Sequence, residues 1–215
     1  MRLLNVKIMR KIFVLIACER SQVECSAFRA LGANAYSCDI QRCAGNHPEW
    51  HIQGDVTPFL HGQRYFYTQD GKLHHAGRWD LIIAHPPCTY LSRFASPHLF
   101  RGGQLNELRH AYGLVARDFF YKCMNAQADK IAVENPTPNR IWELPKPTQI
   151  VQPYEFGHPY QKRTLLWLKN LPPLFPTIWS CGRKSWVANS RLPNTKSRSF
   201  EGIAKAMAEQ WYPLL

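Results

Sequence analysis

Short apolar runs, each followed at once by polar residues, constrain the fold of this chain more than any other feature. The runs lie within residues 12–18, 79–84 and 130–134. Runs of this length without polar alternation are typical of strands buried on both faces of a sheet. Helical patterns follow the first run and precede the third. Strands that alternate with helices predict parallel βαβ units, so we expect an α/β fold with a mostly parallel central sheet and helices on both faces.

The other expected elements follow from local signals. Ser21 is the expected N-cap of a helix that Gly32 ends. A longer helix is expected over residues 105–124, in which the apolar residues near helical spacing are Leu108, Tyr112, Val115, Phe119 and Phe120. The remaining elements are strands over residues 35–39 and 164–168, a hairpin over residues 63–75 about Asp70 and Gly71, and a last helix over residues 202–211.

Length and charge limit the domain organisation and the partners. The 215 residues suit a single domain, in which residues 170–200 form a short variable segment rich in Pro, Ser and Asn. The chain has 27 Lys and Arg against 15 Asp and Glu, a net charge of +12, which favours a polyanionic partner. Residues 183–198 add to this charge, because they contain five basic residues and no acid.

Cysteine use and hydropathy indicate the compartment. The seven cysteines are an odd number and several lie inside apolar runs, which favours reduced, mostly buried thiols over a disulfide framework. No stretch approaches the ~20 apolar residues of a membrane span. Residues 12–18 run straight into Glu19 and Arg20 without a small-residue cleavage site, which favours a strand over a signal peptide. We therefore expect a cytoplasmic protein.

Chemically active side chains follow the expected strands. In parallel sheets the ligand site lies beyond the carboxyl ends of the strands, and Glu19, Asp39, Cys88 and Glu134 fall at those ends. Cys88 comes after two prolines, so its thiol is held on a rigid loop, where a cation or backbone donors must lower its pKa for nucleophilic attack. A cysteine and a carboxyl across one pocket suit attack on an electron-poor heterocycle, because the thiol adds to a ring carbon while a protonated carboxyl holds a ring nitrogen.

Several segments resemble, in the same order, the motifs of the cytosine-5 DNA methyltransferase family, and the resemblance spans most of residues 12–211. Pro86-Pro87-Cys88, with Ser92 four residues after the cysteine, resembles the nucleophile motif. Glu134-Asn135 resembles the motif whose glutamate binds the cytosine ring. The further matches are the opening S-adenosylmethionine motif through residues 27–32, the ribose-binding acid at Asp39, the adenine turn at residues 54–56, the later Gln/Arg motif at residues 156–163 and the final motif at residues 202–204.

The resemblance implies a Rossmann-like S-adenosylmethionine-dependent methyltransferase fold, S-adenosyl-L-methionine as the cofactor, DNA or a cytosine nucleotide as the substrate, and no metal. It implies catalytic roles for Cys88, Glu134 and Arg163. The residues implied at the cofactor are Cys18, Glu19, Ser21, Asp39, Ile40, Asp55, Val56 and Pro86. The residues expected at DNA, where cations contact phosphates, are Ser92, Lys162, Arg183, Lys184, Arg191 and Arg198.

The implied reaction has three steps. Cys88 adds to C6 of cytosine while Glu134 stabilises N3. The activated C5 then attacks the methyl group of the cofactor. Loss of the C5 proton and expulsion of Cys88 complete the turnover, and in duplex DNA the base must first be flipped out of the stack.

The chain also departs from the family pattern. Residues 19–22 contain no glycine where the cofactor turn is expected, and Thr89 stands where the family usually has glutamine. Gln161 and Arg163 align with the later motif only after a shift of one residue. Only 33 residues separate Leu168 from Gly202, where the family normally inserts a target-recognition domain. The chain therefore looks most like the compact methyltransferase-like proteins of phages, for which we expect a monomer in the bacterial cytoplasm with relaxed sequence specificity.

Four alternatives stay open. A methyltransferase acting on an exocyclic amine also has a Pro-Pro pair, but with Tyr or Phe next, where this chain has Cys88. A zinc site could use Cys38, Cys43, His47 and His51, although their spacing is tighter than that of usual structural zinc ligands. The altered cofactor turn would also suit an inactive protein that binds DNA or a partner. Finally, the short variable segment permits a free cytosine nucleotide as substrate, against which the positive charge argues.

Overall fold

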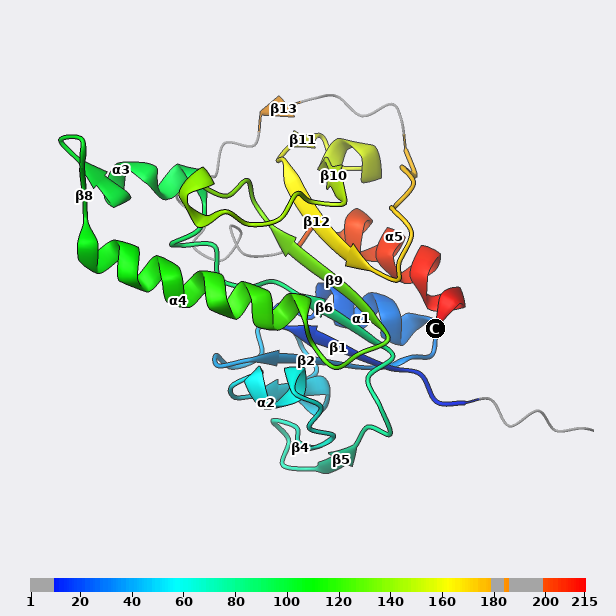
Figure 1. Ribbon diagram of the computed structural model, residues 1–215. Coiled ribbons are helices and arrows are strands. Elements are labelled where there is room, and N and C mark those ends of the chain that lie inside the picture. The colour runs from blue at the N-terminus through cyan, green and yellow to red at the C-terminus, as the bar shows by residue number, and fades with distance from the viewer. Residues whose placement is uncertain (1–9, 179–183, 186–198) are drawn as a thin grey trace, which may run out of the picture.

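The expected buried runs form the middle of a mixed, mostly parallel sheet in the computed structural model, which describes residues 10–178, 184–185 and 199–215 (Figure 1). Four neighbouring pairs of strands are parallel, and the last two strands along one side run antiparallel to their neighbours. The order across the sheet is β10 (Gln149–Val151), β12 (Thr164–Lys169), β9 (Lys130–Asn135), β6 (Leu81–Ala84), β1 (Phe13–Ala17), β2 (Asn34–Asp39) and β3 (His51–Gln53).

Helices cover both faces of this sheet, as the alternating pattern predicted. Figure 1 shows one long helix on one face and two helices side by side on the other. These are α4 (Glu107–Met124) on the first face, with α1 (Val23–Ala30) and α5 (Glu201–Trp211) on the second.

Strand β1 explains why both faces are buried. Leu15 joins a core cluster that contains Phe120 of α4 and Trp167 of β12. Its neighbour Val14 joins the opposite cluster, which contains Met207 of α5. Because successive side chains of a strand point to opposite faces, a continuous apolar run supplies both cores at once.

A hairpin, short helices and several 3-10 turns complete the fold. The expected hairpin is confirmed, since Tyr65 pairs with His75 in an antiparallel ladder. None of the helices among the described residues is long and apolar enough to cross a membrane. The smaller elements are α2 (Thr57–Leu60), β4 (Tyr65–Tyr67), β5 (Leu73–His75), α3 (Ser96–Leu99), β7 (Phe100–Arg101), β8 (Gln104–Leu105), β11 (Tyr160–Gln161), β13 (Lys184–Ser185) and the 3-10 turns η1 (Pro48–Trp50), η2 (Arg93–Ala95), η3 (Arg140–Trp142), η4 (Pro153–Phe156) and η5 (Tyr212–Leu214).

The start of α1 differs from the prediction. Its N-cap residue is Gln22, with a φ of 61°, and not Ser21. The Ser21 hydroxyl donates to Glu19 Oε1 over 3.2 Å, and the same carboxyl oxygen accepts the backbone N–H of Glu24 over 3.1 Å. The carboxyl group of Glu19, from outside the helix, therefore satisfies the amide that a serine cap would have satisfied.

The apolar face predicted for the long helix is also wrong in part. Leu108, Tyr112 and Val115 are 67%, 50% and 68% exposed, so they lie on the solvent side of α4. Phe120 is buried as predicted, together with Gly113 and Cys123. The absence of a side chain at Gly113 matters, because a Cβ there would lie 1.9 Å from the ring of Trp142.

We expect Gly113→Ala to lower the free energy of unfolding by about 1–3 kcal/mol, because the added methyl group must displace the buried Trp142 ring. The gain in helix propensity, at most about 1 kcal/mol, acts in the opposite direction. Urea denaturation followed by tryptophan fluorescence measures the difference. A variant more stable than wild type would contradict the close packing of α4 on Trp142.

Candidate active site at the carboxyl ends of the strands

The side chains expected to carry chemistry meet at one edge of the sheet. Glu19 follows β1, Asp39 ends β2, Cys88 lies in the segment after β6, and Glu134 is the last residue but one of β9. These strands are mutually parallel neighbours, so their carboxyl ends share the edge at which α/β proteins bind ligands.

The segment that carries Cys88 is held from both sides. Asn135, next to Glu134, donates from its buried side chain to the carbonyl of Pro86 over 2.7 Å. On the other side Arg109 of α4 donates to the carbonyl of Thr89 over 3.0 Å. Cys88 is an exposed residue, although its thiol is partly desolvated. The loop is thus fixed while its nucleophile stays accessible.

We expect Asn135→Ala to lower the free energy of unfolding by about 1–3 kcal/mol, because it leaves the carbonyl of Pro86 without its buried donor. Asn125→Ala is the matched control, since the Asn125 side chain makes an exposed bond at the end of α4. Thermal and urea unfolding compare the two variants. Equal effects would contradict a special role for the bond between the two loops.

The environment of the Cys88 thiol sets its reactivity. Partial desolvation and the nearby carboxylate of Glu134 raise the pKa of the Cys88 thiol, while the ammonium group of Lys162 acts to lower it. At rest the thiol is therefore protonated. Arg163, for which the sequence predicted a catalytic role, is exposed, and Lys162 is the partly buried cation that acts on the thiol.

A histidine that the sequence reasoning missed lies beneath this loop. His85 Nδ1 is 3.1 Å from Glu134 Oε2, and His85 Nε2 is 3.3 Å from Glu24 Oε1. Although burial disfavours the charged form, the charges of Glu24 and Glu134 raise the pKa of His85 well above its usual value. The signal was present, because His85 stands directly before the prolines at the end of a buried strand, but Glu24 has no sequence signal beyond its place in a helix.

Two buried carboxyl groups share this region in different protonation states. Burial opposes ionisation of Glu24, but the imidazolium of His85 outweighs it and brings the pKa of Glu24 to about 2. Burial and the charge of Glu24 raise the pKa of Glu19 well above its usual value, so Glu19 is neutral. Glu19 and Ser21, expected at the cofactor, are thus engaged with each other and with the start of α1.

The remaining residues expected at the cofactor gather at the ends of β1, β2 and β3. Burial, together with the carboxylates of Asp39 and Asp55, raises the pKa of the Cys18 thiol to about 12. Ile40, beside Asp39, is 74% exposed. Val56 and Pro86 are buried and help to pack this edge.

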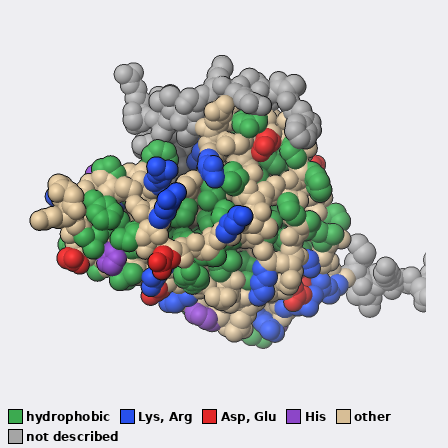
Figure 2. All heavy atoms as spheres, turned by 45° about the horizontal axis from the view of Figure 1, so that its top comes forward, with side chains coloured by type: hydrophobic (Ala, Val, Ile, Leu, Met, Phe, Trp, Pro, Cys, Tyr) green, Lys and Arg blue, Asp and Glu red, His purple; other side chains and the backbone are tan. Residues whose placement is uncertain are grey.

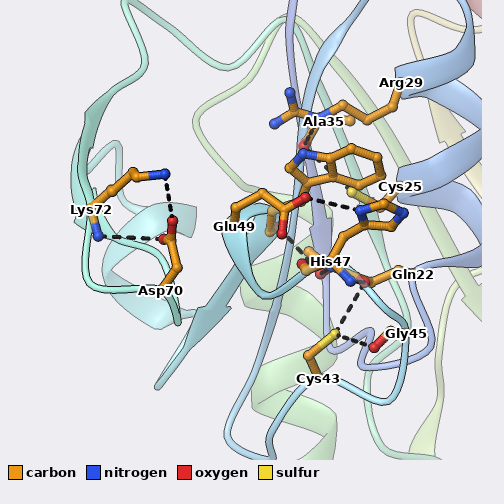
Figure 3. Close-up of polar contacts among 12 residues, drawn as sticks. Gln22, Cys25, Arg29, Ala35, Cys43, Gly45, His47, Glu49, Asp70 and Lys72 are labelled. Atoms are coloured by element: carbon orange, nitrogen blue, oxygen red, sulfur yellow. Dashed lines mark hydrogen bonds and ion pairs between the residues drawn. The ribbon is translucent and has the colours of Figure 1, made fainter.

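Gln22 takes the place of the missing glycine turn. Its buried side chain accepts from the thiol of Cys43 over 3.0 Å and donates to the carbonyl of His47 over 2.8 Å (Figure 3). The same thiol lies 3.2 Å from the carbonyl of Gly45. A side chain thereby ties the turn after β1 to the loop after β2.

The residues considered as zinc ligands have other partners. The ring of His47 contacts Glu49 over 2.9 Å, and the ring of His51 lies between the hydroxyl of Ser37 and the carbonyl of Gln41. Within residues 10–178, 184–185 and 199–215 there is no group of three or more His, Cys, Asp or Glu side chains that could hold a metal.

Of the residues expected at DNA, Lys162 is the cation that acts on the Cys88 thiol, and the other five fall into three groups. Ser92 is buried, and its hydroxyl accepts the backbone N–H of Phe94 over 3.2 Å, a contact that orders the loop after Cys88. Lys184 belongs to β13, which pairs with β11. Figure 2 shows several Lys and Arg side chains spread over a mainly uncharged face. The predictions for Arg183, Arg191 and Arg198 lie outside the described residues.

Comparison with protein-family models and with curated proteins finds no match for this chain, so no family is assigned and its function is inferred from the site.

Proposed function

We propose that the chain is a DNA cytosine-5 methyltransferase with Cys88 as its nucleophile and S-adenosyl-L-methionine as its cofactor. One observation carries the proposal. Cys88 follows β6 and Glu134 lies near the end of the neighbouring parallel strand β9. The Asn135 side chain joins the end of β9 to the segment that carries Cys88, and the carboxylate of Glu134 raises the pKa of the thiol. A nucleophile and a carboxyl side by side suit addition to a ring carbon beside a ring nitrogen.

The side chains divide the reaction between them. Cys88 Sγ adds to C6 of the cytosine ring, and the nearby ammonium of Lys162 favours the thiolate that attacks. Glu134 holds N3, so that the negative charge that develops in the ring is neutralised. The cofactor supplies the methyl group that C5 receives. After C5 loses its proton, Cys88 leaves and the aromatic ring is restored.

The residues present fit the adenosine half of the cofactor. Asp39 and Asp55 offer carboxylate acceptors for hydroxyl and amine groups, and the exposed side chain of Ile40 offers an apolar surface for a flat ring. Glu19 and Ser21 fit the methionine half less well, because Glu19 Oε1 already accepts from the Ser21 hydroxyl and from the backbone N–H of Glu24. Among the described residues no group donates a hydrogen bond to Glu19 Oε2.

DNA is the substrate that the charge favours. The chain carries a net charge of +12, and the loop after Cys88 contains Arg93 and Phe94, of which Phe94 is 91% exposed. A cation beside an exposed aromatic ring suits contact with a phosphate and a neighbouring base. The short segment at residues 170–200 supports relaxed sequence specificity.

The test is incubation of the protein with labelled cofactor and either duplex DNA, single-stranded DNA or free cytidine nucleotides, followed by mass spectrometry of the nucleosides. We expect 5-methylcytosine in DNA. Methyl groups on the exocyclic amine would overturn the C5 chemistry, and label in the free nucleotide alone would overturn DNA as the substrate. If calorimetry shows no binding at millimolar cofactor, the chain is a binding protein without transferase activity.

A further inference from the structure

The proposed reaction leaves one largely buried group without a role, the imidazole of His85, whose side chain is 14% exposed. We propose that His85 is a positioning residue that stores a proton and passes it to Glu134 when the cytosine ring binds, with Glu24 as its permanent counterion. This inference rests on the proposed function, because it concerns the proton that Glu134 needs in order to hold N3.

The sheet fixes the relative position of the two side chains. Strands β6 and β9 are parallel, and Ala84 lies opposite Val133, so the next residues along, His85 and Glu134, stand side by side. The backbone N–H of His85 also bonds to the carbonyl of Ala17 over 3.0 Å, and the proline that follows restricts its backbone. His85 therefore has little freedom to withdraw from Glu134.

The position of Glu24 determines which ring nitrogen of His85 can give up its proton. Its side chain is 1% exposed and lies in the first turn of α1, where the helix dipole favours a negative charge. A buried carboxylate of this kind needs a partner, and His85 Nε2 at 3.3 Å supplies it. The Nε2 proton thus stays on His85, facing the carboxylate of Glu24, and Nδ1, which faces Glu134, carries the transferable proton.

The transfer is a single balanced step. The N–H bond at His85 Nδ1 breaks and an O–H bond at Glu134 Oε2 forms across the 3.1 Å contact, which leaves a neutral imidazole and a neutral carboxyl. A turn of the carboxyl about its terminal bond presents the O–H to N3 of cytosine. When Cys88 leaves C6, the proton returns to His85 by the same route, so that the cycle neither gains nor loses a proton.

The groups around His85 support a stored positive charge. Glu24 faces it from α1 and Glu134 from β9, while Glu19, after β1, is neutral and bonds to Glu24. Ser199, just before α5, also bonds to Glu24. The cation Lys162 acts on Cys88. Two acids that face the imidazole from opposite sides raise the pKa of His85 well above that of a free histidine.

The first test replaces His85 by asparagine, whose amide can still donate toward Glu134 but cannot carry a transferable proton. We expect kcat/KM for methyl transfer to fall by about 10²-fold at neutral pH. We also expect the alkaline fall in kcat/KM, which in the wild type follows deprotonation of His85, to disappear. A purely structural role would lower the activity without changing the pH profile, and an unchanged rate and profile would overturn the proposal.

A second variant tests whether the loss of activity comes from misfolding. His85→Asn alone leaves the buried carboxylate of Glu24 without its counterion. We therefore combine His85→Asn with Glu24→Gln, which removes both charges together. We expect this double variant to melt near the wild type and to show the same loss of activity. Wild-type activity in the folded double variant would overturn the proposal.

A readout that needs no activity separates this inference from the proposed function. NMR of the protein labelled at histidine follows the two ring nitrogens of His85 through a pH titration. We expect an imidazolium that titrates well above free histidine and loses its proton at lower pH in Glu134→Gln. If His85 titrates with the pKa of free histidine, the proposal that His85 stores a proton is overturned, even if 5-methylcytosine is formed. A raised titration without methyl transfer would overturn the proposed function alone.

Discussion

A Cys88→Ala variant is expected to lose methyl transfer by about 10³-fold or more while its fold is retained. Cys88 is exposed on a loop that is held by backbone and side-chain contacts of its neighbours, so its thiol contributes little to packing. Without the thiol no adduct forms at C6, and C5 has no activated state that can accept the methyl group. Rates with labelled cofactor and DNA measure the loss, and circular dichroism measures the fold.

The pH dependence of the wild type adds a second check on the same residue. Because desolvation and Glu134 raise the pKa of the Cys88 thiol, the thiolate fraction is small at neutral pH and grows as the pH rises. We therefore expect the rate of adduct formation to increase as the pH rises above neutral toward the raised pKa of the thiol. Oligonucleotides that carry 5-fluorocytosine trap this adduct, because fluorine blocks the loss of a proton from C5.

Cys123→Ala is the control, because Cys123 is a buried thiol of α4 with no place in the proposed reaction. It should keep both methyl transfer and the trapped adduct. Full activity in Cys88→Ala, or an adduct located by peptide mapping at another residue, would remove Cys88 from the mechanism.

The sheet could be predicted from the sequence because its central strands are buried on both faces. The runs that became β1, β6 and β9 are continuous and apolar, and each ends where polar residues begin. The strands His51–Gln53 and Gln149–Val151 were missed, because each has only three residues and includes glutamine. Their positions depend on pairing with a strand already in the sheet, which local sequence does not encode.

The candidate site was predictable only in its outline. Parallel strands place Cys88 and Glu134 at one edge, and this follows from strand order alone. The contact of His85 with Glu24 joins residues 61 positions apart in the chain through the packing of α1 against the sheet. Local patterns carry no information about such a pair. In the same way, no local pattern indicates that the carboxyl group of Glu19, which the resemblance places at the cofactor, also accepts the backbone N–H of Glu24.

Glu24→Ala is expected to lower the free energy of unfolding at neutral pH by about 3–5 kcal/mol. The substitution removes the counterion of the largely buried imidazolium of His85 and leaves a cavity where the Glu24 side chain, 1% exposed, had been. It also removes the hydrogen-bond partner of Glu19. Urea denaturation at a series of pH values measures the loss, with Glu209→Ala as the control, since the Lys205–Glu209 pair is exposed and should contribute less than about 1 kcal/mol.

The difference in stability between wild type and Glu24→Ala should itself depend on pH, and the two partners set its limits. The folded-state pKa of Glu24 is about 2, below its unfolded value of 4.5, so its contribution is present above pH 4.5 and is lost as the pH falls toward 2. The folded-state pKa of His85 is raised, so its contribution is present below its unfolded value of 6.5 and is lost as the pH rises through the raised value. The difference in stability should therefore be largest between pH 4.5 and pH 6.5, where both contributions are fully present. A difference that stays constant from acid to alkaline pH would show that Glu24 stabilises the protein by packing alone and that no ion pair with His85 exists.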